Sequence, residues 1–149
     1  MMNKFTLLVT LFIFFQNQSF ACMMVMPLKE ETKKLASDKF LGEVQEYTFN
    51  KKNQTARIKY KVLKSIYRDT KSIPKFREVI FAQNINVTVP KTKEKFIKKY
   101  GKTHTVGTLP YSRKMQEEGK YRGLVQAPKG NTLPIIVQEI CTRPYLVKE

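Results

Sequence analysis

The sequence predicts a mainly β protein: a small closed or partly open barrel of five strands with one or two flanking helices. One segment near residue 60 alternates between apolar and basic residues, the two-residue period of a strand with one buried face. Further stretches rich in β-branched and aromatic residues are separated by turn residues. Helical patterns occur at only two places, whereas a parallel α/β fold needs helices between most of its strands.

The first 21 residues are typical of a secretory signal peptide. Lys4 precedes an apolar run over residues 5–15, and small residues stand just before Cys22. A transmembrane anchor needs about 18 or more consecutive apolar residues, whereas this run spans 11 positions and two of them are Thr. We therefore expect cleavage before Cys22, a periplasmic or secreted location, and one mature domain over residues 22–149.

The only two cysteines, Cys22 and Cys141, lie at opposite ends of the mature domain. Because disulfides persist in oxidising compartments, export predicts one intramolecular bridge between them. On the chain-entropy account, closing a loop of about 100 residues contributes up to about 4.7 kcal/mol. The alternative is a lipoprotein, lipid-anchored through Cys22, with Cys141 as a free thiol. Lipoprotein signals usually carry Leu three residues before the cysteine, where this chain has Ser19.

An apolar arm and a short helix are expected to come next. Pro27 directs the arm, residues 23–27, into an extended or turning path. We expect the methionines of the arm to pack in the core, with an adaptable contact surface as the alternative. Residues 28–37 are rich in Lys and Glu with sparse apolar positions, which favours a short helix that ends before Asp38.

The first two strands are predicted to form a hairpin. The first runs over residues 40–49 and contains Gly42, which indicates a bulge or sharp bend. Polar turn residues at 50–53 precede the second strand. Its apolar, core-facing residues are Ala56, Ile58, Tyr60 and Val62, and its outward-facing basic residues are Arg57, Lys59 and Lys61.

The middle of the chain predicts two strand segments and a helix. Residues 76–82 form the first strand segment, and residues 85–89 alternate as a strand until Pro90. Residues 91–102 hold six lysines and one acid, with Phe96, Ile97 and Tyr100 spaced to share one face of an amphipathic helix. Gly101 fits its C-terminal cap.

The last third is predicted as a loop followed by two strands. The loop carries Gly107 and Pro110, and His104 before them, the only histidine, is expected at the surface. Residues 119–125 are expected to form a strand, and residues 133–140 another that ends at Cys141.

The sequence contains little that predicts catalysis. A single histidine excludes paired-histidine metal sites within the chain, and no Gly-rich phosphate loop is present. Ser112 lies eight residues from His104, but no supporting acid accompanies them. We expect a protein that is not an enzyme and needs no cofactor or intrinsic metal.

The chain is strongly basic. It has 28 Lys and Arg against 12 Asp and Glu, a formal charge of +16 that falls to +15 without the leader. Such an excess favours anionic partners, namely nucleic acid, acidic polysaccharide or a membrane surface, although a lysine-rich surface also simply keeps an exported protein soluble. The predicted polyanion-binding residues are Arg57, Lys59, Lys61, Lys95, Lys98 and Lys99.

Short motifs along the mature chain resemble the netrin-like module, which is shared by tissue inhibitors of metalloproteinases and exported bacterial relatives. They are the initial Cys22, Ser37–Val44, Tyr60–Leu63, Gly119–Tyr121 and Cys141–Arg143. The resemblance spans most of the mature chain. It implies a five-stranded OB-type barrel with flanking helices and an N-terminus tethered by a disulfide.

The resemblance also implies a function for the N-terminus. In the inhibitors, the α-amino nitrogen and carbonyl oxygen of the first cysteine chelate the zinc of the target enzyme, and Cys22 is the matching position. A catalytic zinc keeps one coordination position open for water, which such a pair can displace. The chain departs from the inhibitors, which begin Cys-x-Cys, because Met24 stands where the second cysteine would be.

Two classes of function follow. The first is binding of a zinc metallopeptidase or another exported protein through Cys22, Met23, Met24 and Val25. The alternative is binding of acidic polysaccharide or an anionic membrane surface by the basic residues, with Tyr60 and Tyr67 as candidate stacking groups. Export argues against nucleic acid as the partner, and Tyr60 shares its strand face with core residues.

Overall fold

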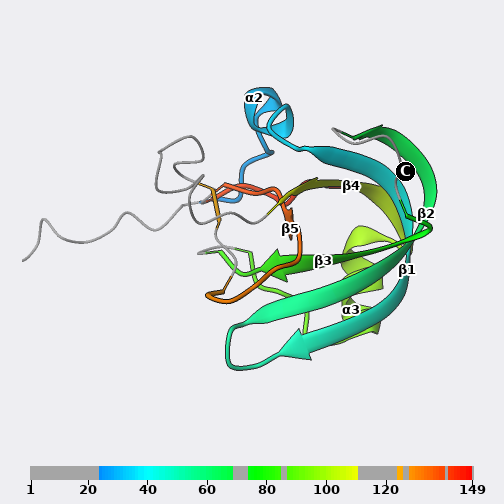
Figure 1. The fold of residues 1–149 in the computed structure, drawn as a ribbon. Helices are drawn as coiled ribbons and strands as arrows, with labels where there is room; N and C mark the ends of the chain where they lie inside the picture. Colours follow the sequence, from blue (N-terminus) through cyan, green and yellow to red (C-terminus); the bar gives the residue numbers. More distant parts are fainter. Residues whose placement is uncertain are drawn as a thin grey trace, which may run out of the picture.

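The computed structural model describes residues 24–68, 74–84, 87–110, 124–125, 128–139 and 141–148. These residues form a closed five-stranded barrel with one further strand and two short helices (Figure 1). The strands are β1 (Asp38–Asn50), β2 (Thr55–Arg68), β3 (Phe76–Ala82), β4 (Thr103–Leu109), β5 (Ile135–Ile136) and β6 (Leu146–Lys148), and the helices are α2 (Glu30–Lys33) and α3 (Lys93–Tyr100).

The strand order confirms the predicted OB-type barrel. The order is β1-β2-β3-β5-β4, and β1 closes the barrel by pairing with β4. Neighbouring strands are antiparallel except β3 and β5, which are parallel. Helix α3 lies between β3 and β4 in the chain, and β6 adds to β4 on the edge opposite β1.

The bend in β1 is the feature that closes the barrel. This strand pairs with β2 along its whole length and with β4 through its first residues, so it belongs to both sides. Its register with β2 shifts between Leu41 and Gly42, which confirms the predicted bulge. A Cβ at Gly42 would lie 2.9 Å from the rings of Phe40 and Tyr60, so only glycine fits this close approach.

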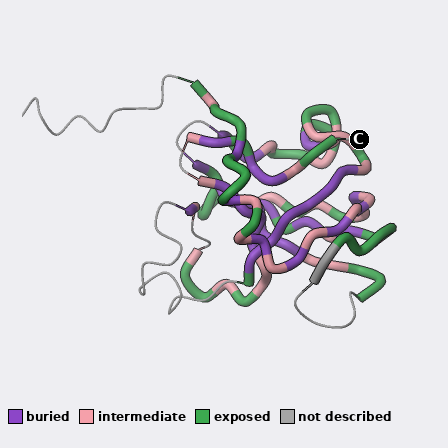
Figure 2. The backbone as a smooth tube through the Cα atoms, turned by 90° about the horizontal axis from the view of Figure 1, so that it is seen from above, coloured by how far each residue is buried: buried purple, intermediate pink, exposed green. Residues whose placement is uncertain are grey.

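The apolar core fills the barrel. Ile58 and Tyr60 of β2 are fully buried, as their alternation predicts, while Arg57 and Lys61 between and beyond them are exposed. Phe96 of α3 is also fully buried and joins this core cluster. Figure 2 shows the buried stretches running through the centre of the fold, with exposed residues at the turns. A second cluster, which includes Leu28, Leu109, Ile135, Val137 and Tyr145, packs outside the barrel.

The two helices follow the prediction. Thr92 caps α3, because its Oγ1 accepts a hydrogen bond from the Lys95 amide at 3.3 Å. Gly101 ends the helix with φ of +88° and donates to the Ile97 carbonyl at 2.8 Å. The expected helix over 28–37 is confirmed but shorter, spanning Glu30–Lys33. No helix in the described ranges combines the length and apolarity needed to cross a bilayer.

The prediction of a loop around Gly107 was wrong, because this segment is strand β4. Six of its seven residues are buried, so the alternation that marks a half-exposed strand is missing. Gly107 lies under the ring of Tyr145, where a Cβ would come within 1.9 Å of the ring. His104, predicted at the surface, is fully buried.

Two other predicted strands differ from the structure. Residues 87–89 form no strand, although Val87 and Val89 are buried. Instead, the side-chain oxygen of Asn84 accepts a hydrogen bond from the Val87 amide, which makes a turn. Residues 85–86 and most of 119–125 lie outside the described residues; Leu124 makes an isolated bridge with Glu139. The strand predicted over 133–140 is reduced to β5.

Candidate functional site

The N-terminal arm, which the structure describes from Met24 to Pro27, is bonded to the C-terminal segment of the barrel. The Met26 amide donates to the Cys141 carbonyl at 2.9 Å, and the Met26 carbonyl accepts from the Arg143 amide at 2.8 Å. These bonds make a parallel bridge between Met26 and Thr142. The arm therefore has a fixed position on the barrel surface.

The two described methionines of the arm, Met24 and Met26, face solvent, which corrects for them the expectation that the arm methionines pack in the core. Met24 is 71% exposed and Met26 is 48% exposed, whereas Val25 between them packs against the barrel cluster. Alternate residues of an extended chain face opposite sides. Because Val25 points inward, Met24 and Met26 point outward.

The turn that receives the arm is held by Asn84. Its side-chain nitrogen donates to the Thr142 carbonyl at 3.2 Å and to the Gln138 side chain at 3.3 Å. Thr142 Oγ1 accepts from the Glu139 amide at 3.0 Å within the turn. Cys141 has a φ of +73°, a left-handed conformation that is uncommon outside glycine. A polar network thus fixes the backbone beside Cys141.

Two of the four predicted partner-binding residues, Cys22 and Met23, lie outside the described residues. Cys141 is described and is not a free thiol. Cys22 lies four positions before Met26, and an extended chain of four residue steps reaches about 13–14 Å. Since Met26 is hydrogen-bonded to Cys141, Cys22 is within chain reach of Cys141. Their pairing stays a prediction.

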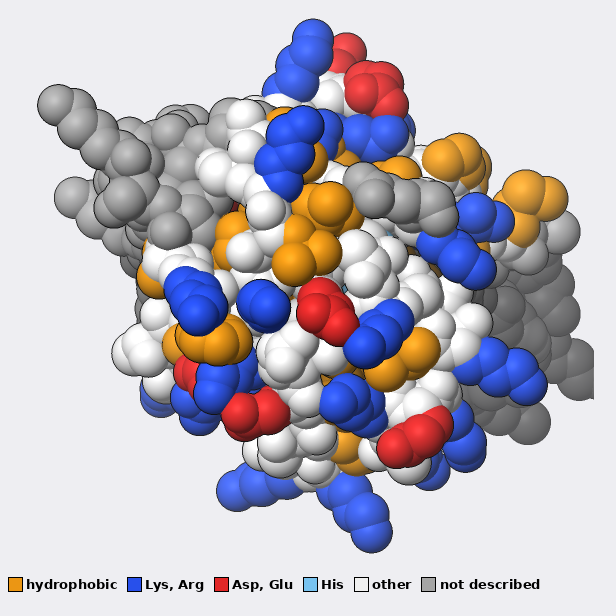
Figure 3. All heavy atoms as spheres, turned by 90° about the vertical axis from the view of Figure 1, so that its right-hand side faces the viewer, with side chains coloured by type: hydrophobic (Ala, Val, Ile, Leu, Met, Phe, Trp, Pro, Cys, Tyr) orange, Lys and Arg blue, Asp and Glu red, His pale blue; other side chains and the backbone are white. Residues whose placement is uncertain are grey.

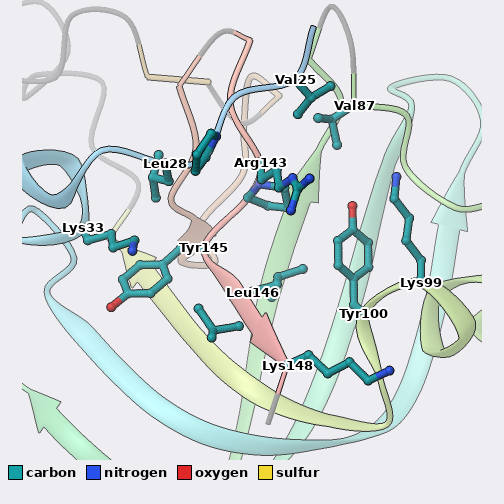
Figure 4. A pocket seen from close by; sticks show the side chains of 13 residues that line it. Val25, Leu28, Lys33, Val87, Lys99, Tyr100, Arg143, Tyr145, Leu146 and Lys148 are labelled. Carbon is teal, nitrogen blue, oxygen red and sulfur yellow. The ribbon is translucent and has the colours of Figure 1, made fainter.

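A pocket of about 590 Å³ lies beside the arm (Figure 4). Its apolar walls include Val25 of the arm, Leu28, Val87 and Leu146. Its basic lining residues are Lys33, Lys99, Arg143 and Lys148, and among the described residues that line it none is acidic. The arm therefore forms one wall of a cavity that apolar and basic residues line together.

Tyr100 lines this pocket, and its hydroxyl is unsatisfied. Its oxygen is buried without a hydrogen-bond partner in the described part of the chain. Burial raises the pKa of Tyr100 to about 12, and the nearby Arg143 cation acts in the opposite direction. The hydroxyl is thus a neutral donor. In Figure 4 it points toward the side of the pocket where Arg143 and Lys99 lie.

The predicted polyanion-binding residues differ in their surroundings: some are paired with acids among the described residues, and others are not. On the barrel wall, Arg57 pairs with Glu78, and Lys59 pairs with Glu46 at 2.7 Å. The hydrogen bond to Lys59 lowers the pKa of Glu46.

The remaining members of the set have different surroundings. Lys61, Lys95 and Lys98 are exposed. Lys99 instead lines the pocket, with its Nζ 5.2 Å from the centre of the Tyr100 ring. Figure 3 shows one face on which basic side chains are spread among acidic ones.

His104 has a structural position in the core. Its Nδ1 donates to the Gly101 carbonyl at 3.1 Å, so its Nε2 accepts from the Tyr60 hydroxyl at 2.8 Å. Burial lowers the pKa of His104 to about 4, which leaves the ring neutral at pH 7. Ser112, considered with it, lies outside the described residues.

Sequence reasoning missed the role of Tyr100 and the pocket. The amphipathic pattern of residues 91–102 places Tyr100 on the apolar face, but only the fold brings Arg143 and Lys148 next to it. Across the described ranges, no group of three or more His, Cys, Asp or Glu side chains is placed to hold a metal ion. Comparison with family models, curated proteins and solved structures gave no match to this chain.

Proposed function

We propose that this chain is an exported, non-enzymatic binding protein that contacts a partner protein through its N-terminal arm. The observation that carries the proposal is the pair of backbone hydrogen bonds on Met26, which fix an extended segment with two exposed methionines. A contact surface that is already ordered loses little conformational entropy on binding. Methionine side chains adapt to the shape of a partner.

The specific form of this proposal is inhibition of a zinc metallopeptidase by Cys22. The α-amine and carbonyl of the first mature residue would displace the water on a catalytic zinc. The predicted bridge to Cys141 would hold Cys22 in place. The hydrogen bonds on Met26 support this, because they already hold the arm next to Cys141. The resemblance to the netrin-like module motivates the choice of partner.

The test compares two forms of the protein on a panel of zinc peptidases. One form begins at Cys22, and the other carries one additional Ala before it, which moves the α-amine away from the tethered residue. We expect inhibition by the first form and at least tenfold weaker inhibition by the second. If both forms inhibit equally, or neither inhibits, zinc chelation is wrong.

The contribution of the arm is tested separately with Met24→Lys. Lysine at this exposed position leaves the fold intact and removes an apolar contact. We expect weaker inhibition of any peptidase that the mature protein inhibits. Leu63→Lys is the matched control, because Leu63 is also an exposed apolar residue, at 48% against 71% for Met24, but lies on β2. If the two variants weaken inhibition equally, the arm does not contribute to inhibition.

The alternative function is binding of acidic polysaccharide or an anionic membrane surface. It is favoured by the charge of +16 and by exposed Lys61, Lys95 and Lys98, for which no ion pair is formed with the described residues. The pairing of Arg57 and Lys59 with acids argues against the β2 face as its main site. The helix lysines are then the principal candidates.

A further inference from the structure

We propose that the pocket beside the N-terminal arm binds a small amphiphile, a ligand with an anionic head group and an apolar body. This inference concerns a second site and does not depend on the function proposed for the arm. It rests on three features of the pocket: an unsatisfied buried donor, an excess of cations and apolar walls of suitable size.

The head group is assigned by Tyr100 and the cations around it. A buried hydroxyl without a partner is destabilising unless a ligand or water satisfies it. Arg143 acts on Tyr100 electrostatically, and Lys99 lies against the Tyr100 ring. A carboxylate placed here would accept from the Tyr100 hydroxyl and from Arg143 together, and charge-assisted hydrogen bonds of this kind are the strong ones.

The charge balance of the pocket selects an anion. Three of the cations form no salt bridge within the described residues, namely Lys99, Arg143 and Lys148. Cations gathered around one cavity repel each other. A bound anion offsets the repulsion, whereas a cationic ligand would add to it.

The apolar walls of the pocket indicate that the body of the ligand is apolar. Val25, Leu28, Val87 and Leu146 give the cavity apolar walls between the basic side chains (Figure 4). A volume of about 590 Å³ is within the usual range of small-molecule sites. The site is a hollow rather than a flat basic surface, which favours a free amphiphile over a membrane.

Isothermal titration calorimetry with three probes of equal chain length tests the ligand class. The probes are decanoate, decanol and decyltrimethylammonium, each used below its micelle concentration with the mature protein. We expect decanoate to bind at least tenfold more tightly than decanol, and decyltrimethylammonium not to bind. Equal binding of decanoate and decanol, or tighter binding of the cation, would overturn the proposal.

Two variants test the assignment of the head group. Tyr100→Phe removes only the hydroxyl, and Arg143→Gln removes the charge; each should weaken decanoate binding about tenfold or more. Tyr47→Phe and Arg57→Gln are the matched controls, since Tyr47 donates to the Pro90 carbonyl and Arg57 pairs with Glu78, both outside the pocket lining. The controls should bind decanoate as the parent protein does.

Two results contradict the assigned site. One is decanoate binding that is unchanged in both pocket variants while their circular dichroism shows a native fold. The other is binding to phosphatidylglycerol vesicles that both pocket variants weaken as much as they weaken decanoate binding, which would make the pocket part of a membrane-contact surface. Vesicle binding unaffected by Tyr100→Phe supports the free-ligand site.

Discussion

At the scale of single residues, burial gives the hydrogen-bonded pair Tyr60 and His104 a structural role. His104 is fully buried, donates to a backbone carbonyl and accepts from a hydroxyl, so both of its ring nitrogens are satisfied. Burial stabilises the neutral form. The only histidine of the chain therefore acts as a structural group whose protonation opposes folding.

The first prediction is that stability falls in mild acid because of His104. Its pKa is about 4 when folded and about 6.5 when unfolded, so between these values the unfolded state binds more protons. Stability is fully present above pH 6.5 and is lost toward pH 4. We expect a loss of about 2 kcal/mol between pH 6.5 and 4.5, measured by urea unfolding.

His104→Gln is the control for this prediction. Glutamine retains one donor and one acceptor but does not titrate, so its stability should be nearly constant over the same interval. The carboxyl groups of Glu43 and Glu46, whose pKa values are lowered by Lys102 and Lys59, lose their contribution only below their ordinary value of 4.5. The same slope in both proteins would show that His104 is not the titrating group.

At the scale of elements, β2 and β3 could be predicted closely, while β4 and the turn before α3 could not. One face of β2 contacts the core and the other contacts solvent, so its sequence alternates. β4 is buried on both faces, and its mixture of threonines, histidine and glycine carries no period. The pocket depends on contacts between residues far apart in the sequence, which periodicity does not contain.

The second prediction concerns the contact of β4 with Tyr145. Gly107→Ala should destabilise the protein by roughly 1–3 kcal/mol or more, because the new methyl group would overlap the buried Tyr145 ring. Denaturant unfolding measures the loss. Adding Tyr145→Ala should make the double variant less destabilised than the sum of the single variants.

Gly130→Ala is the control for the overlap. Gly130 has a φ of +84° but nothing within 4 Å of an added Cβ. Gly130→Ala should therefore lower the free energy of unfolding only by the backbone strain, about 1 kcal/mol. Strictly additive effects at Gly107 and Tyr145, or a harmless Gly107→Ala, would contradict the packing described here.

The third prediction links Asn84 to the N-terminal arm. Asn84→Ala should cost about 1–3 kcal/mol, because it leaves buried partners such as the Val87 amide and the Thr142 carbonyl unsatisfied. The turn beside Cys141 should loosen, and hydrogen exchange at the Met26 amide should become faster. Asn131→Ala, which removes a bond to the Leu133 carbonyl in another loop, should leave that exchange rate unchanged.

At the scale of the whole molecule, the OB-type barrel was predictable because few folds accommodate five short strands with so few helices in this length. What the arrangement adds is the meeting of the two ends of the described chain. The arm pairs with the segment after β5, next to Cys141, and the pocket opens between them. Both proposed binding sites are therefore at this junction.

The fourth prediction concerns the net charge. The protein should bind a heparin-type matrix weakly and elute with increasing salt, because counterions screen such contacts. Replacing Lys95, Lys98 and Lys99 by Gln should lower the elution salt concentration more than replacing Arg57, Lys59 and Lys61, since Arg57 and Lys59 are already paired with acids. A larger effect of the β2 triple would contradict this reading, as would retention that is insensitive to salt.

The central claim, a mature N-terminus tethered on the barrel as a binding surface, is tested most directly by intact-mass analysis of the protein from its native compartment, with and without reduction and alkylation. We predict a chain that begins at Cys22, two hydrogens lighter before reduction, in which Cys22 and Cys141 react with the alkylating reagent only after reduction. A chain that retains its first 21 residues, a lipid mass on Cys22, or two thiols alkylated without reduction would contradict the account.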